Sequence, residues 1–145
     1  DEAIEDAQSM MNEGYRNSSI YGMLGYFKLL RNDDLDETTK LCEEAYDYNS
    51  DDRDIKDNLS ICYFRKGEYE KAEKISDELV GSAPNFVEGF YHGIQIAMKL
   101  NKYDKAAEYA EKLKECKRSG MTTVTEEEVN KLIQEVKNHN ENTIG

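Results

Sequence analysis

The chain has 145 residues, a formal net charge of −12 and a single proline. This length allows one domain with a core of its own, and the composition leaves no flexible linker rich in proline, glycine or serine. The negative charge repels nucleic-acid phosphates and anionic membrane surfaces, which argues against both as partners. No stretch resembles a signal peptide or a transmembrane helix. Apolar residues at helical spacing, without strand alternation, predict an all-α fold.

A tetrapeptide pattern recurs along the chain at a step of 34 residues. Its copies are 35–38, 69–72 and 103–106, and a partial copy at 1–3 falls in phase with them. A step of 34 residues is the length of a helix–turn–helix repeat. Such units stack because neither helix pair buries its apolar face alone.

Taken in chain order, the pattern predicts a helix at 1–12, helix pairs at 18–31 with 35–48, 54–66 with 69–81 and 87–101 with 103–117, and a last helix at 125–138. In one domain over 1–145, this gives the second helix of a partial repeat (1–17), repeats over 18–53, 54–87 and 88–120, and a capping helix with its tail (121–145). Residues 139–145 are expected to be frayed. Because the first helix lacks a partner, we expect a fragment of a longer protein. The alternative is a natural short first helix.

The best copy of the repeat has a specific set of packing residues. Leu59-Ser60 is followed by Tyr63, Ala72 and Pro84, and this order resembles the tetratricopeptide repeat over roughly residues 1–118. The resemblance implies an α-solenoid of about three helix–turn–helix repeats with a C-terminal capping helix. Neighbouring copies keep Tyr21, Leu24, Gly25, Ala45 and Tyr46 on one side and Phe90, Tyr103, Ala106, Ala110 and Leu113 on the other.

The signature residues predict how the helices approach one another. Small residues face large ones where two helices pack closely. We expect Gly25, Ser60, Ala72 and Ala106 at these approaches, and the tyrosines to be mostly structural.

The C-terminal segment has the signals of a separate helix. Thr125 and Glu128 form a capping box. An apolar stripe follows at helical spacing. This predicts a helix that caps the last repeat, or else one after which a further repeat followed. The stripe consists of Val129, Leu132, Ile133 and Val136.

The family resemblance implies a binding groove lined by the first helix of each pair. An apolar, aromatic floor there favours a protein or peptide with apolar anchors. The acidic charge, with 12 acids and four bases in residues 1–50, would steer a basic partner, and the alternative is that it only makes the surface soluble. Phe64, Tyr91 and Met98 are expected to carry most of the binding energy. The alternative is that some groove residues pack under the capping helix or a neighbouring repeat. The groove residues are Tyr26, Leu29, Asp57, Ile61, Phe64, Tyr91, Gln95 and Met98.

One binding mode of the family is excluded by its residues. Relatives that bind the acidic tails of chaperones use a clamp of Lys, Asn and Arg. Only Asn58 agrees with that clamp, and Glu88 would repel a carboxylate. The matching positions are Gly22, Tyr26, Asn58, Glu88 and His92.

A second hypothesis of a different class is a structural segment that spaces or dimerises domains of a larger parent protein. It requires contacts at the ends of the repeat array. We expect self-association through the first helix, whose apolar side offers more surface than one following helix covers. The residues concerned are Ala3, Ile4, Ala7, Met10 and Met11.

No enzyme, cofactor or metal site is predicted. Cys42, Cys62 and Cys116 form no Cys-x-x-Cys pair and lie at no ligand spacing from a histidine. Buried free thiols suit a reducing compartment, which favours the cytoplasm or a cytoplasmic part of a larger protein. A calcium-loop spacing at Asn32, Asp34, Asp36 and Glu43 fails because Glu37 occupies the place of the required glycine.

Overall fold

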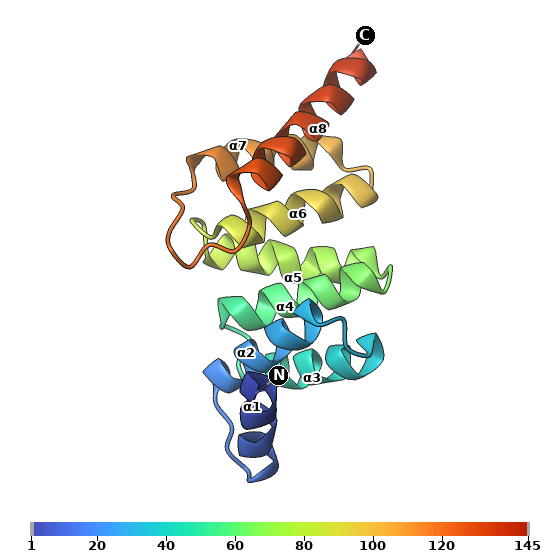
Figure 1. Cartoon of the computed structure of the whole chain (residues 1–145). Coiled ribbons are helices and arrows are strands. Elements are labelled where there is room, and N and C mark those ends of the chain that lie inside the picture. Colours follow the sequence, from blue (N-terminus) through green and yellow to red (C-terminus); the bar gives the residue numbers. More distant parts are fainter. Residues whose placement is uncertain (1, 145) are drawn as a thin grey trace. The chain divides into compact units, whose positions relative to one another are not determined.

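The computed structural model describes the backbone of residues 2–144, without the side chains of Ala3 and of 142–144. Within this part the chain is all-helical (Figure 1). Each predicted helix is confirmed, with ends within two residues of the prediction except at the end of the last helix. The helices are α1 (Glu2–Asn12), α2 (Ser18–Leu30), α3 (Leu35–Tyr48), α4 (Arg53–Arg65), α5 (Tyr69–Ser82), α6 (Val87–Lys99), α7 (Tyr103–Glu115) and α8 (Glu126–Ile144).

The chain divides into two compact units. Unit 1 comprises residues 1–68 with α1 to α4, and unit 2 comprises residues 69–145 with α5 to α8. The boundary falls inside the predicted repeat 54–87, between its two helices. The single domain expected over 1–145 stays a prediction.

The turns that follow α2, α4 and α6 have the same backbone geometry. Asn32, Gly67 and Asn101 all have positive φ, between 57° and 78°. In each turn the amide of this residue bonds to the carbonyl three residues before it, and the next amide bonds to the carbonyl five residues before. This is the Schellman motif, which ends a helix in a left-handed residue. The repeat step is thus visible in the backbone.

Unit 1 buries α1 against α2. Ile4, Ala7 and Met11 are buried in a core with Tyr21 and Leu24. The expected surplus of apolar surface on the first helix is therefore wrong for these three residues, because α2 already covers them. Only Met10 of the expected set is exposed, and the side chain of Ala3 lies outside the described residues.

The small residues lie where the helices approach closely, as predicted. Ser60, Ala72 and Ala106 are completely buried. A Cβ atom on Gly25 of α2 would lie 2.9 Å from Asn58 Nδ2 and 3.2 Å from Cys42 Sγ. The absence of a side chain at this position lets α2 pack against α3 and α4.

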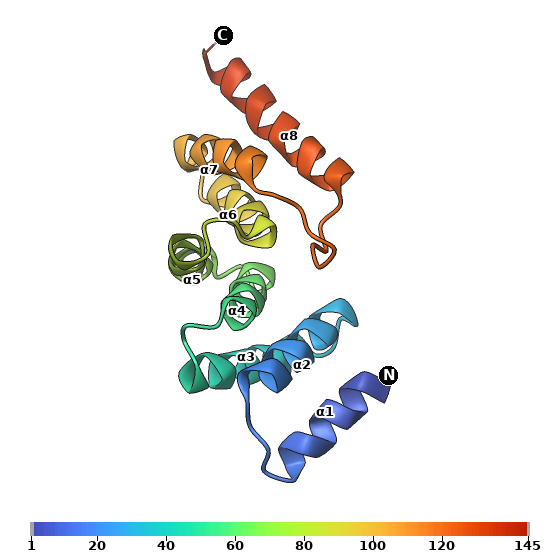
Figure 2. The same cartoon turned by 90° about the vertical axis from the view of Figure 1, so that its left-hand side faces the viewer.

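The capping helix α8 closes the core of unit 2. Val129, Leu132 and Val136 are buried in one cluster with Phe90 and Leu113, and Figure 2 shows α8 beside α6 and α7. The predicted capping box at the start of α8 is confirmed. The amide of Glu128 donates to Thr125 Oγ1 at 3.0 Å, and the amide of Thr125 donates to Glu128 Oε1 at 3.1 Å.

The expected fraying after residue 138 is wrong for the described residues, because α8 continues to Ile144. His139 stacks on the ring of Tyr103 with centroids 3.6 Å apart. This contact holds the added turn against the start of α7. The sequence around it is polar and shows no core-facing stripe.

Candidate functional site

Helix α2 is apolar on more than one side. Its inner face buries Tyr21, Leu24 and Gly25 in unit 1. Its outer face nevertheless carries Met23, Tyr26 and Leu30, which we call the α2 stripe. Their exposed fractions are 40%, 38% and 65%, and their spacing places them in one row along the helix. An outer helix face is ordinarily polar, so a row of large apolar side chains there indicates an interaction surface.

Helix α4 lies along α2 and is fixed to it by side chains that bond to backbone carbonyls. Asn58 Nδ2 donates to the Gly22 carbonyl at 2.9 Å, and Arg65 Nη1 donates to the Leu29 carbonyl, also at 2.9 Å. Ile61 lies between Asn58 and Arg65 on the same face of α4, because residues three and four apart are neighbours on a helix. The seam between the two helices is therefore rigid and partly apolar.

The predicted groove residues of unit 1 divide into two groups. Tyr26 is exposed, and Ile61 and Phe64 are half-buried. Leu29 and Asp57 are only 5% and 8% exposed, so they offer almost no surface to a partner.

Sequence reasoning missed Met23 and Leu30. Leu29 and Leu30 are adjacent and equally apolar, and a step of one residue turns a helix by about 100°. The spacing of Met23, Tyr26 and Leu30, three and four residues apart, was the sequence signal that places Leu30 rather than Leu29 on the exposed face.

The predicted groove residues of unit 2 are only partly exposed. Tyr91, Gln95 and Met98 are all half-buried. Tyr91 and Met98 pack against the core to which α8 contributes. Burial raises the pKa of Tyr91, and the carboxylates of Glu128 and Glu135 on α8 raise it further. Packing against this core agrees with the alternative from the sequence, and the groove in unit 2 stays a prediction.

Unit 1 is more acidic than unit 2. Residues 1–68 contain 17 acidic and eight basic residues, whereas residues 69–145 contain 14 and 11. The bases beside the α2 stripe are already engaged. Arg31 bonds to both oxygens of Asp33 at 2.8 and 2.7 Å, and Lys28 lies 3.8 Å from Asp33. The Arg31 guanidinium lowers the pKa of the Asp33 carboxyl.

Two positions of the chaperone-tail clamp have internal roles in this chain. The Asn58 amide is bonded to α2, and the buried Glu88 carboxylate accepts a 2.8 Å hydrogen bond from the Thr123 amide. Glu88 therefore fixes the loop that leads into α8. Neither side chain is oriented to hold the carboxylate of a partner.

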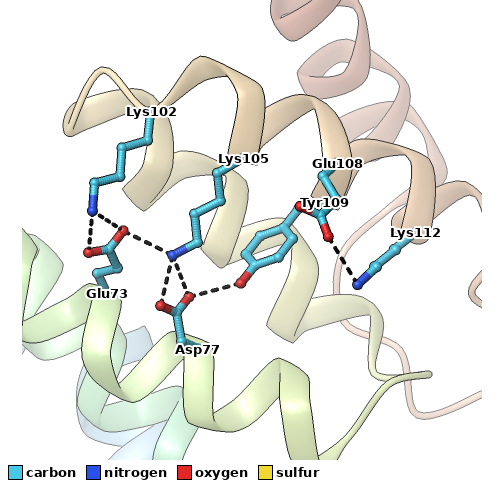
Figure 3. Close-up of polar contacts among 7 residues, drawn as sticks. All are labelled: Glu73, Asp77, Lys102, Lys105, Glu108, Tyr109 and Lys112. Carbon is cyan, nitrogen blue, oxygen red and sulfur yellow. Dashed lines mark hydrogen bonds and ion pairs between the residues drawn. The ribbon is translucent and has the colours of Figure 1, made fainter.

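The densest polar cluster of unit 2 joins α5 to α7 (Figure 3). Lys105 Nζ lies 2.9 Å from Glu73 and 2.7 Å from Asp77, and Lys102 Nζ lies 2.8 Å from Glu73. The Tyr109 hydroxyl donates to Asp77 at 2.8 Å. Burial raises the pKa of Glu73, but the hydrogen bonds from Lys102 and Lys105 outweigh it and lower the pKa overall. Each charge faces an opposite charge, so the arrangement is structural.

The described part of the chain has a small hollow in unit 2 and no cluster of metal-binding side chains. No group of three or more histidine, cysteine, aspartate or glutamate side chains there is placed to hold a metal ion. A hollow of about 200 Å³ lies between the end of α7 and the start of α8, lined by Leu113, Arg118 and Val129 among others. Ligand pockets usually have ~300–1,000 Å³. None of the described helices combines the length and apolar character that crossing a membrane requires.

Comparison with known proteins identifies the repeat. Residues 29–89 match the sequence model of the tetratricopeptide repeat family. Among curated proteins, no sequence matches the chain at a significant level.

Solved structures of tetratricopeptide repeat (TPR) proteins share the fold. YrrB, a TPR protein with an unusual peptide-binding site, is 16% identical with a TM-score of 0.69 over 93% of this chain and 64% of its own. The Sgt2 TPR domain from Aspergillus fumigatus is 17% identical with a TM-score of 0.74 over 87% of this chain and 80% of its own. The first TPR of Spaghetti (RPAP3), bound to the HSP90 peptide SRMEEVD, is 14% identical with a TM-score of 0.70 over 84% of this chain and 91% of its own.

These likenesses show the fold, an all-α arrangement of TPR helix pairs with an added C-terminal helix. The chain spans less than two thirds of the length of YrrB.

Proposed function

We propose that this chain, whose residues 29–89 match the sequence model of the tetratricopeptide repeat family, is a non-catalytic module that binds a basic protein segment with apolar anchors. The single observation that carries the proposal is the α2 stripe of Met23, Tyr26 and Leu30, exposed on a helix whose other face is core. Ile61 and Phe64 of α4 extend the surface. Apolar anchors on a partner helix or extended peptide would cover this row and remove it from water.

Charge supports a basic rather than an acidic partner. Unit 1 has a net charge of −9, and its bases nearest the stripe bond to groups of the chain itself. Such a field accelerates association with a basic segment and opposes an acidic one. The peptide bound to Spaghetti contains two glutamates and an aspartate. Because the clamp positions here include Glu88 and a buried Asn58, we propose a different ligand chemistry.

The partner class is tested with two designed peptides of about 18 residues, or five helical turns. One has a leucine face and a lysine face, and the other has glutamate in place of every lysine. We expect the lysine peptide to bind, to bind more weakly as salt is raised from ~0.05 to ~0.3 M, and to shift the NMR signals of α2 and α4. Equal binding of the glutamate peptide, or shifts confined to unit 2, would contradict the proposal.

Variants test the site itself. Tyr26→Ser and Leu30→Ser should each weaken binding of the lysine peptide about tenfold or more, because large anchors dominate such interfaces. Met121→Ser is the matched control, since Met121 is 84% exposed and lies in unit 2. A control variant that weakens binding as much as Leu30→Ser would show that the peptide binds any exposed apolar side chain.

We place the protein in the cytoplasm, or in a cytoplasmic part of a larger protein, because its three cysteines are free and two of them are buried. The spacing or dimerising segment stays a hypothesis without a specific observation in its favour. Its proposed contacts on α1 are largely buried by α2.

A further inference from the structure

Two cysteines that are distant in sequence meet inside unit 1. Cys42 of α3 and Cys62 of α4 are 2% and 0% exposed, and their Sγ atoms are 3.6 Å apart. Both are free thiols. They lie in the packed interior and take no part in the α2 stripe, so the proposed binding function does not account for their proximity.

The distance suits a reversible covalent link. A disulfide requires sulfur atoms about 2.05 Å apart, so the two sulfurs need to approach by only ~1.5 Å. We propose that Cys42 and Cys62 are a modification site, at which a peroxide-class oxidant forms a disulfide that joins α3 to α4.

The surroundings assign different roles to the two thiols. The hydrogen bond with Cys42 lowers the pKa of Cys62, burial opposes this, and the positive charge of Arg65, three residues along α4, lowers it further. The hydrogen bond with Cys62, together with burial, raises the pKa of Cys42. Cys62 is the attacking thiol of the proposal, because the thiolate is the nucleophile and Arg65 places a positive charge three residues along the same helix. Cys42 is the resolving thiol.

The chemistry balances with hydrogen peroxide as the oxidant. The Cys62 thiolate attacks one peroxide oxygen, the O–O bond breaks, and Cys62 becomes a sulfenic acid while hydroxide leaves. Cys42 sulfur then attacks the Cys62 sulfur, the S–O bond breaks, and the Cys42 proton leaves with the hydroxyl as water. Overall, two thiols and one hydrogen peroxide give one disulfide and two waters.

Packing controls access to the pair. A Cβ atom at Gly25 would already lie 3.2 Å from Cys42 Sγ, so little space surrounds the sulfurs. The oxidant reaches them when α3 and α4 separate locally, which makes the reaction slow and dependent on local opening. Cys116 of unit 2 differs. Its sulfur faces the Lys112 carbonyl at 3.4 Å, and burial raises its pKa.

The test uses the full chain with Cys116→Ser, which removes the half-buried thiol. The reduced protein is treated with hydrogen peroxide under native conditions, unfolded in the presence of N-ethylmaleimide, and measured by mass spectrometry. We expect a monomer that has lost two hydrogen atoms, takes up no maleimide, and gives a cross-linked peptide pair containing Cys42 and Cys62. Dithiothreitol should reverse the change. Two free thiols, a sulfinic acid, a link between chains, or a link that forms only in urea would overturn the proposal.

Single variants in the same background test the order of the steps. In Cys42→Ala, Cys62 has no resolving partner, so its sulfenic acid should accumulate and be trapped by dimedone. In Cys62→Ala, Cys42 should be labelled at least about fivefold less. Circular dichroism checks that both variants fold. Equal labelling, or stronger labelling of Cys42, would overturn the assignment of Cys62 as the attacking thiol.

Discussion

Helix α2 of unit 1 and helix α6 of unit 2 occupy the same place in the repeat but have different surroundings. In unit 2, α6 is covered by the capping helix, and Tyr91 and Met98 pack against the core that α8 completes. In unit 1, α2 presents Met23, Tyr26 and Leu30 to solvent. At the repeat offset of 69 residues, α6 has His92, Gln95 and Lys99 at the places of Met23, Tyr26 and Leu30, so the apolar stripe of α2 is not repeated on α6.

The largest effect should come from weakening the cap. Leu132→Ala removes a buried side chain from the core of unit 2 and should cost about 3 kcal/mol in the free energy of unfolding. Leu30→Ala on the α2 stripe is the matched change in unit 1 and should cost far less. Urea unfolding followed by circular dichroism compares them. Equal losses would mean that the stripe is core and that the contrast between the units is wrong.

The next effect concerns close helix approach. Gly25→Ala places a methyl group 2.9 Å from Asn58 Nδ2 and should destabilise unit 1 by about 2 kcal/mol through overpacking. Gly81→Ala in α5 is the control, because its Cβ atom would meet nothing within 4 Å. Gly81→Ala should raise the free energy of unfolding by up to about 0.5 kcal/mol, because alanine has less conformational freedom than glycine in the unfolded chain. A neutral Gly25→Ala would show that α2 shifts easily on its neighbours.

The helix boundaries were predictable because they depend on local signals. The capping box at Thr125 spans four residues, and the repeated tetrapeptide marks the start of the second helix in each pair. The structure has the same turn at Asn32, Gly67 and Asn101, just before these helices. At these places the local sequence signals and the overall fold agree, and such agreement is what allows a helix boundary to be predicted from sequence.

The failures all involve contacts between distant residues. Polar residues after 138 predicted fraying, but His139 stacks on Tyr103, 36 residues earlier. Cys42 and Cys62 seemed unrelated by spacing, although α3 and α4 bring them together. Leu29 and Leu30 are adjacent and equally apolar, yet Leu29 is buried within unit 1 and Leu30 is exposed.

Acid should weaken the polar link of unit 2 through Glu73. The pKa of Glu73 is lowered in the folded protein. The contribution of Glu73 to the free energy of unfolding is therefore fully present above its pKa in the unfolded chain, ~4.3. It is lost as the pH falls through the lower pKa of the folded protein. We expect Glu73→Gln to destabilise the protein at pH 7, and the difference from the wild type to shrink below pH ~4. Glu111→Gln, which breaks an exposed pair with Lys114, should show almost no difference at either pH. A constant difference for Glu73→Gln would assign the loss to packing rather than to charge.

The smallest effect separates two tyrosines that the sequence placed on one surface. Tyr26 is exposed on the α2 stripe, so Tyr26→Ser should change the free energy of unfolding by less than about 0.5 kcal/mol. Tyr91 packs against the core beside α8, so Tyr91→Ser should cost about 1 kcal/mol through lost apolar burial. Urea unfolding at one pH resolves the difference if both variants are measured beside the wild type. If Tyr26→Ser costs as much as Tyr91→Ser, the ring of Tyr26 supports the helix packing of unit 1, and the row available to a partner reduces to Met23 and Leu30.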